Sequence, residues 1–296
     1  MNALQEKPKL LRKPPWLKVR PPYAAECRKI KNTLAELELH TVCQEAACPN
    51  IAECFACGTA TFLILGNICT RHCLYCNVPQ GMPLPVAENE LDRLIAAVQK
   101  MDLKYVVVTS VTRDDLPDGG AGFFADCISK LRQARPDCRI EVLIPDFQGS
   151  LPALEAVLAA HPDVVNHNME TVKPLFPRLR PQGNYDVSLE LLKKVAASSV
   201  IAKSGFMVGF GEGNDDILHL IDDLAAVSCA RLTIGQYQRP TMKHWPVARY
   251  YHPDEFARLR EIAYQKGFQY VETGPLVRSS YHAAQADPGN DVLAGV

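Results

Sequence analysis

The sequence lacks three features that would assign it to large classes of protein. No apolar run reaches the roughly 20 residues that a membrane-spanning helix needs, although apolar residues make up 47% of the chain. Basic residues do not outnumber acidic ones, 32 against 33, whereas a general nucleic-acid binder needs a basic excess to neutralise phosphates. The first fifteen residues contain no apolar segment typical of a secretory signal. We therefore expect a cytoplasmic protein that binds neither membranes nor nucleic acid.

Cysteine, in contrast, is abundant, with 11 residues. In a reducing compartment such a number indicates metal binding or catalysis rather than disulfides. Three of the cysteines lie in apolar patterns and are expected to be small buried side chains: Cys127, Cys138 and Cys229.

Six others form two groups of three, each one short of a complete four-cysteine site. The first group has the spacing C-x4-C-x5-C and consists of Cys43, Cys48 and Cys54. The second has the spacing C-x3-C-x2-C and consists of Cys69, Cys73 and Cys76. A [4Fe–4S] cluster offers four irons to protein ligands, so three thiolates would leave one iron open. Zinc is the alternative, but a structural zinc site takes four ligands arranged as two close pairs.

From residue 59 onward, buried apolar runs alternate with amphipathic segments. Strands are predicted at 60–65, 105–109, 139–144, 163–166, 200–208 and 231–235. Helices are predicted at 88–101, 121–134, 151–160, 186–198, 214–227 and 254–266. This alternation predicts a parallel sheet with right-handed crossovers. Because six units are two short of a closed barrel, we expect an α/β fold with a partial (β/α)6 TIM-type barrel. A doubly wound flat sheet is the alternative.

The flanking segments differ from this rhythm and suggest three parts. Residues 1–58 would form an irregular and helical extension that carries the first cysteine group, with a helix near 26–39. Residues 59–273 would form the barrel, with a last short strand at 269–272, and residues 274–296 a C-terminal tail. In open and closed α/β sheets the chemistry lies at the carboxyl ends of the strands. The second cysteine group directly follows the first predicted strand, so it lies at that end.

The second cysteine group, with the aromatic Tyr75 before its last cysteine, resembles the motif of the radical S-adenosylmethionine superfamily. The first group narrows the resemblance to the lipoyl synthase family, as do several other segments. These are Gly58-Thr-Ala-Thr-Phe62, Thr109-Ser-Val-Thr-Arg-Asp-Asp-Leu116, His167-Asn-Met-Glu-Thr171, Gly235-Gln-Tyr237, Lys243-His244 and Arg278-Ser-Ser-Tyr281. Two positions depart from the expected pattern: Cys57 is a rival ligand to Cys54, and Asn67 replaces an expected aspartate.

The resemblance implies an enzyme with two [4Fe–4S] clusters and S-adenosylmethionine. The cluster on Cys69, Cys73 and Cys76 would cleave S-adenosylmethionine to a radical that removes hydrogen from carbons 6 and 8 of a protein-bound octanoyl chain. The cluster on the first cysteine group would donate sulfur and be consumed. Its fourth ligand would be Ser280, with Ser279 as the second choice. The implied partners are octanoylated lipoyl carrier domains, an electron donor such as ferredoxin or flavodoxin, and a protein that repairs the spent cluster.

Strand-end positions suggest further contacts to S-adenosylmethionine. Thr109 and Ser110 would line the methionine end of the cofactor, and Asn168 and Glu170 would reach its ribose hydroxyls. Arg180 would hold a carboxylate through a bidentate pair. Other interpretations are a different radical enzyme with an auxiliary cluster, such as a methylthiotransferase, an iron–sulfur electron carrier, or a zinc-stabilised binding module.

Overall fold

The computed structural model describes residues 11–18, 25–45, 48, 50–56 and 61–286. Its centre is an eight-stranded sheet whose strands are ordered as they occur along the chain. The strands are β1 (His40–Thr41), β2 (Thr61–Ile64), β3 (Tyr105–Ser110), β4 (Arg139–Leu143), β5 (Val164–Asn166), β6 (Ile201–Val208), β7 (Arg231–Gln236) and β8 (Tyr270–Gly274). Strand β1 pairs with β2 in antiparallel fashion, and every pair from β2 to β8 is parallel.

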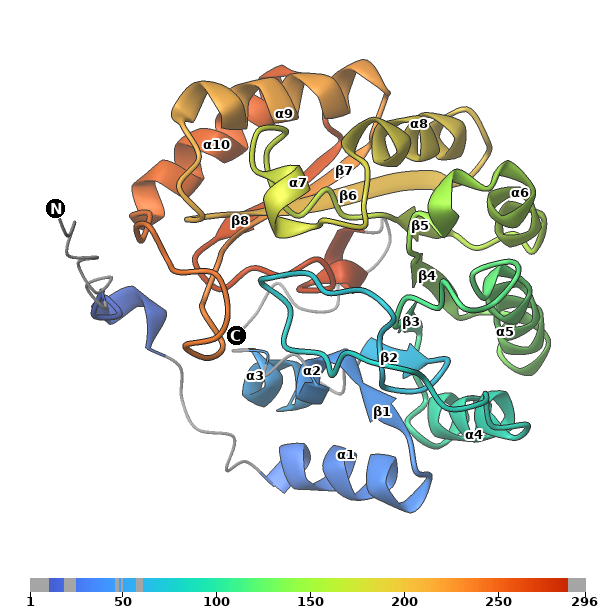
Figure 1. The fold of residues 1–296 in the computed structure, drawn as a ribbon. Helices are drawn as coiled ribbons and strands as arrows, with labels where there is room; N and C mark the ends of the chain where they lie inside the picture. The colour runs from blue at the N-terminus through green and yellow to red at the C-terminus, as the bar shows by residue number, and fades with distance from the viewer. Residues whose placement is uncertain (1–10, 19–24, 46–47, 49, 57–60, 287–296) are drawn as a thin grey trace, which may run out of the picture.

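Helices follow the strands and cover the outer face of the curved sheet (Figure 1). They are α1 (Ala25–Glu36), α2 (Val42–Glu45), α3 (Ile51–Ala56), α4 (Glu90–Lys100), α5 (Ala121–Ala134), α6 (Leu151–Ala159), α7 (Phe176–Leu179), α8 (Tyr185–Ala196), α9 (Asn214–Ala226) and α10 (Pro253–Gln265). Short 3-10 helices are η1 (Pro15–Leu17), η2 (Phe147–Gly149) and η3 (Ala283–Ala286).

This architecture confirms the predicted partial barrel. The six predicted βα units correspond to β2–β7, and the short strand expected at 269–272 is β8. The doubly wound alternative is wrong, because such a sheet reverses its strand order at a switch point, whereas the order here runs from β1 to β8 without reversal. The boundary expected at residue 58 lies outside the described residues, as does Cys57. Among the helices of the described part, none is long and apolar enough to cross a bilayer.

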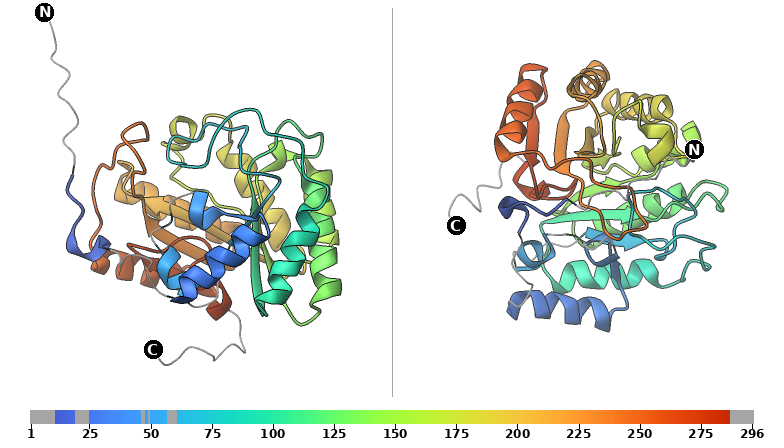
Figure 2. Two further views of the ribbon diagram at one scale, coloured as in Figure 1. Left: turned by 90° about the horizontal axis from the view of Figure 1, so that it is seen from below. Right: turned by 60° about the vertical axis from the view of Figure 1, so that its left-hand side comes forward.

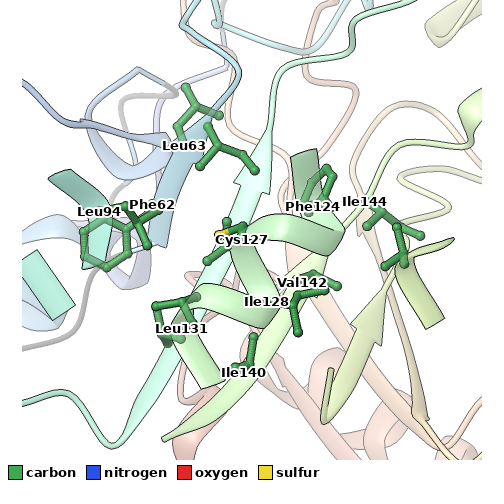
Figure 3. Packing of buried hydrophobic residues seen from close by; sticks show 14 of the residues in the cluster. Phe62, Leu63, Leu94, Phe124, Cys127, Ile128, Leu131, Ile140, Val142 and Ile144 are labelled. Atoms are coloured by element: carbon green, nitrogen blue, oxygen red, sulfur yellow. The ribbon is translucent and has the colours of Figure 1, made fainter. Parts of the chain in front are cut away.

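The apolar core lies between the strands and the covering helices. Figure 3 shows one part of it, in which Leu94 of α4 and Phe124 and Ile128 of α5 pack beside the strand residues Phe62 and Val142. The three cysteines expected as buried side chains are 0–4% exposed, which confirms that prediction. Burying each leucine, isoleucine, valine or phenylalanine of this core stabilises the fold by roughly 1.5–3 kcal/mol. The core therefore holds the strand ends in fixed positions.

The segment around α3 and the segment after β8 meet beside the barrel. In both views of Figure 2 the blue N-terminal helices lie near the red C-terminal segment. Asn50 Nδ2 donates to the Leu276 carbonyl oxygen at 2.6 Å, and the Tyr281 hydroxyl donates to Glu53 Oε1 at 2.8 Å. The tail then enters the barrel, where Ala283 packs against Tyr105 and Val107 on the inward face of β3. The segment around Ser280 is therefore fixed beside α3.

Candidate functional site

The 69–76 loop leaves the carboxyl end of β2 and is held by its own backbone. The amide of Cys69 donates to the Pro79 carbonyl oxygen at 2.8 Å, and the amide of Gly81 returns to the Cys69 carbonyl at 2.9 Å. Burial raises the pKa of Cys76 to about 12, and negative charge on Cys73 and Cys69 adds to the shift. Burial also raises the pKa of Cys73, so the Cys73 and Cys76 thiols are protonated on their own. Because a metal centre deprotonates a coordinating thiol, this donor set fits an iron–sulfur cluster.

Arg71 lies between the first two cysteines of this loop and is buried, with four hydrogen bonds from its guanidinium to two carboxylates. Its guanidinium reaches Asp114 at 2.7 and 2.9 Å and Asp146 at 2.7 and 2.6 Å. Burial opposes the charge, but the hydrogen bonds to Asp146 and Asp114 outweigh it and raise the pKa of Arg71. The backbone amide of Arg71 also points at Cys69 Sγ, at 3.5 Å. The pair thus ties the cysteine loop to the ends of β3 and β4.

Removing one acidic partner should therefore loosen the loop. Asp146 is 3% exposed and Asp114 is 25% exposed. Since breaking a buried ion pair costs about 3–5 kcal/mol, Asp146→Asn should lower the free energy of unfolding of the cluster-free protein by about 3 kcal/mol. Asp114→Asn is the matched control and should cost less, because water reaches that carboxylate. Urea unfolding measures both, and an equal or larger loss for Asp114→Asn would contradict this account.

The first cysteine group lies close to the 69–76 loop, since Asn77 Nδ2 donates to the Glu45 carbonyl oxygen at 3.0 Å. The Cys48 amide donates to the Cys43 carbonyl at 3.0 Å, and the Cys54 amide donates to the Asn50 carbonyl at 2.9 Å. Burial raises the pKa of Cys43 to about 11, and negative charge on Cys48 acts in the same direction. Burial also raises the pKa of Cys48, so Cys43 and Cys48 need a positive centre to ionise. Among the described residues, those of both cysteine groups included, no three His, Cys, Asp or Glu side chains are placed to hold a single metal ion.

One cavity of about 410 Å³ connects the two groups. Its lining includes the thiols of the first group and both candidate serines: Cys43, Cys48, Cys54, Ser279 and Ser280. From the other loop it includes Tyr75 and Cys76, but neither Cys69 nor Cys73, and Asn168 and Glu170 line it as well. Residues more than 220 positions apart in the sequence thus share one chamber.

The predicted S-adenosylmethionine contacts divide into two sets. Asn168 and Glu170 line the cavity, and Asn168 Nδ2 donates to Glu170 Oε1 at 3.0 Å. Thr109, Ser110 and Arg180 lie outside its lining. The Thr109 hydroxyl is already used, since it donates to the Leu143 carbonyl oxygen at 2.8 Å.

Three of the predicted contacts have a buried polar atom without a hydrogen-bond partner among the described residues. These atoms are Ser110 Oγ, Asn168 Oδ1 and Arg180 Nε. Buried polar groups are normally hydrogen-bonded, so these orphaned atoms fit a polar ligand such as an amino-acid or ribose group. Arg180 is 9% exposed and donates from Nη1 to the Asn168 carbonyl at 2.9 Å.

The structure adds Arg278 to the site. Its side chain lines the cavity, and burial lowers its pKa, while negative charge on Cys48 and Glu170 opposes that shift. Burial raises the pKa of Glu170, and the positive charges of Arg180 and Arg278 oppose it. Glu170 therefore lies near two arginines, of which Arg278 lines the cavity and Arg180 does not. The sequence places Arg278 beside Ser280, but nothing in its spacing indicates that it faces Cys48.

Gly235 allows the tail to cross the end of β7. A Cβ at this position would clash with the Val277 carbonyl oxygen. Gly235→Ala should therefore displace the segment that carries Ser279 and Ser280, at a cost of about 1–3 kcal/mol, and lower the iron content of the reconstituted protein.

Gly274, paired with Gly235 across β7 and β8, is the matched control. A Cβ at Gly274 meets only Val277 Cγ2, at 3.3 Å. Gly274→Ala should keep near-normal iron content by chemical analysis. Equal losses in both variants would show that the close approach at Gly235 does not set the position of the tail.

Comparison with known proteins identifies the family. Residues 63–224 match the family model described as the radical SAM superfamily, and residues 1–48 match the N-terminal domain of lipoyl synthase. The chain is 54% identical to a lipoyl synthase of Roseiflexus sp. over 92% of this chain and 91% of the relative. It is 48% identical to one of Oleidesulfovibrio alaskensis over 96% of this chain and 98% of the relative.

Solved structures share the fold at low sequence identity. Streptococcus suis SuiB bound to its precursor peptide SuiA has a TM-score of 0.57 at 12% identity, covering 83% of this chain and 52% of that longer chain. Methylornithine synthase (PylB) has a TM-score of 0.54 at 10% identity, covering 72% of this chain and 70% of that one. With the matches along most of its length, the chain belongs to the lipoyl synthase family of the radical S-adenosylmethionine superfamily.

Proposed function

We propose that the two cysteine groups of this sulfur-inserting enzyme hold separate [4Fe–4S] clusters that face each other across the 410 Å³ cavity. Cys69, Cys73 and Cys76 would ligate one cluster; Cys43, Cys48, Cys54 and Ser280 would ligate the other. The observation that carries this assignment is the shared chamber, which is lined by all three thiols of the first group, by Cys76 of the second and by the serines of the tail. When bound, the first cluster supplies the electron that cleaves S-adenosylmethionine, and the second supplies sulfur for carbons 6 and 8 of the octanoyl chain.

The protein's own residues would bind and orient the reactants. Asn168 and Glu170 would hold the ribose, because Asn168 Oδ1 is an unpaired acceptor at the cavity wall. Ser110 and Arg180, with unpaired Oγ and Nε atoms, would bind the methionine end of the cofactor, beside Thr109. A saturated carbon chain has no acidic hydrogen, so radical chemistry must come from a cofactor. A buried chamber suits such chemistry because it keeps water away from the reactive species.

Ser280 would be the replaceable ligand of the auxiliary cluster. The segment is held on both sides of the serines, by the Leu276–Asn50 and Tyr281–Glu53 hydrogen bonds. A serine oxygen is a harder ligand than a thiolate and binds iron less well, which suits a cluster that must be taken apart. Ser279, which lines the same cavity, is the alternative ligand.

Two substitutions at Ser280 test this role. Ser280→Ala should leave S-adenosylmethionine cleavage within a few-fold of wild type and reduce sulfur insertion strongly. Ser280→Cys should retain the auxiliary cluster more tightly and release its sulfide poorly, because thiolate binds iron better than oxygen does. Product analysis by mass spectrometry and iron analysis measure these effects. Ser279→Ala is the matched control; loss of insertion in that variant, with Ser280→Ala unaffected, would transfer the role to Ser279.

The remaining assignments are proposals on the same basis. The substrate would be an octanoyl chain on a lysine of a lipoyl carrier domain. An electron donor such as ferredoxin or flavodoxin would reduce the first cluster, and a repair protein would rebuild the second. The division into residues 1–58, 59–273 and 274–296 would assign the auxiliary cysteines, the barrel and the serine tail to successive segments. A cytoplasmic location, where reduced carriers are present, would suit this chemistry.

A further inference from the structure

Exposed apolar side chains gather around the 69–76 loop. Four of the seven exposed large hydrophobic residues in the described part of the chain lie on this loop or on segments bonded to it: Leu74, Met82, Leu84 and Met242. Met82 and Leu84 are 87% and 74% exposed. Solvent-exposed apolar groups are common singly, but a group of them indicates an interaction surface.

Hydrogen bonds fix these segments to the loop. Gln80 Nε2 donates to the Cys73 carbonyl oxygen at 3.4 Å, so the stretch that carries Met82 is anchored to the loop. The backbone amide of Trp245 donates to the Leu74 carbonyl at 2.9 Å, and the Leu74 amide donates to Leu179. The loops after β2 and β7 and helix α7 therefore form one face, over the end of the barrel seen toward the viewer in Figure 1.

The segments that form this face carry basic residues and no acidic ones. No aspartate or glutamate occurs in residues 69–84, 172–185 or 237–251, although acidic residues slightly outnumber basic ones in the whole chain. The exposed basic side chains include Arg178, which lies over the Trp245 ring at 4.7 Å, and Lys243, whereas Lys173 at the edge is paired with Asp186 at 2.8 Å. Complementary charge speeds encounter and selects the partner, so the face favours an acidic one.

We propose that this face, defined by Leu74, Met82, Leu84, Arg178, Met242 and Lys243, is the docking site for an acidic one-electron carrier protein that reduces the cluster on Cys69, Cys73 and Cys76. The inference rests on the proposed placement of that cluster. One electron passes from the reduced carrier to the oxidised cluster, which leaves the carrier oxidised by one electron, and no bond forms or breaks. Leu74 lies directly after Cys73 in the chain, so a carrier docked on it is as near to the cluster as a protein surface allows.

The octanoylated carrier domain fits this face less well. The acyl chain of that domain must enter the cavity. The cavity is lined by the first part of the loop after β7, residues 237–240, and by Lys13. Lys13 Nζ donates to Gln238 Oε1 at 2.9 Å, on the side of the N-terminal segment. Met242 and Lys243 are exposed and are not part of that lining. Electron and acyl chain would thus arrive on different sides of one loop.

The test compares two reductants in the cluster-loaded enzyme. The charge-reversal variant Arg178→Glu/Lys243→Glu should bind flavodoxin at least about tenfold more weakly at low ionic strength, measured by calorimetry. Its flavodoxin-driven cleavage of S-adenosylmethionine should fall in proportion at subsaturating flavodoxin, whereas dithionite, which needs no docking face, should drive cleavage at the wild-type rate. Met82→Ser/Leu84→Ser should weaken flavodoxin binding without changing the net charge. Raised salt should weaken wild-type binding more than binding by the charge-reversal variant.

Lys193→Glu/Lys194→Glu on the outer helix α8 is the matched control, with the same change of net charge and side chains 64% and 49% exposed. It should bind flavodoxin as the wild type does. Unchanged flavodoxin affinity in both face variants would overturn the proposal, and so would loss of affinity for an octanoylated carrier domain with flavodoxin binding intact. Failure of dithionite-driven cleavage in the wild type would instead count against the proposed placement of the cluster.

Discussion

Simultaneous replacement of Cys69, Cys73 and Cys76 with alanine should abolish reductive cleavage of S-adenosylmethionine. The three thiols are the only protein ligands that the proposed assignment gives to the first cluster, so their loss removes the source of the electron. Reconstituted wild-type protein should hold about eight irons per chain, and the variant about four, because each [4Fe–4S] cluster contributes four. Iron analysis and chromatography of 5′-deoxyadenosine measure the two effects.

The same variant should keep its auxiliary site and its fold. The tail contacts through Asn50 and Tyr281 do not involve the 69–76 loop, so the remaining iron should stay bound. Thermal unfolding of the cluster-free proteins checks that the fold survives. Retention of all eight irons would refute the assignment of two separate sites.

Replacement of Cys43, Cys48 and Cys54 with alanine should abolish sulfur insertion but spare the cleavage of S-adenosylmethionine. Sulfur insertion should fall to background, because no sulfur source remains. Cleavage of S-adenosylmethionine should remain within a few-fold of wild type, since the proposed cofactor contacts Asn168 and Glu170 and the cysteines of the 69–76 loop are left unchanged. Parallel assays for 5′-deoxyadenosine and for added sulfur separate the two activities.

Loss of cleavage in that variant, with the 69–76 cluster still present by its visible spectrum, would contradict the division of roles. In that case a cysteine outside the proposed six would be examined as a further cluster ligand. Cys57 lies three positions after Cys54, outside the described residues, and Cys57→Ala in the wild-type background is the matched control. That control should keep both activities.

The sequence was sufficient for the barrel because its signals are local and repeated. Buried runs such as 105–109 alternate with amphipathic helices such as 121–134, and this rhythm alone determines a parallel sheet. Strand β1 was not predicted, because a two-residue strand has no periodicity to detect. It forms only because His40 and Thr41 lie beside Leu63 and Phe62 of β2.

The site was only partly predictable, for a similar reason. The cysteine spacings are local patterns. Arg71, in contrast, pairs with Asp114, which lies 43 positions further along the chain, and with Asp146, which lies 75 positions further, and no spacing rule links them. The meeting of Tyr281 with Glu53 spans 228 positions. Such contacts follow from the folded barrel, which brings the tail across Gly235, and not from any motif. The resemblance alone led to Ser280, and the structure supplies the shared cavity that makes its role testable.

The most direct test of the account is to ask whether the enzyme adds sulfur to its expected substrate. Cluster-loaded protein is incubated anaerobically with S-adenosylmethionine, dithionite and an octanoylated carrier peptide. The mass of the peptide is then measured by mass spectrometry. The account predicts a product with two added sulfur atoms in the wild type and none in the variant without Cys43, Cys48 and Cys54, although both form 5′-deoxyadenosine. An unchanged peptide mass in the wild type, despite full clusters and 5′-deoxyadenosine formation, would contradict it.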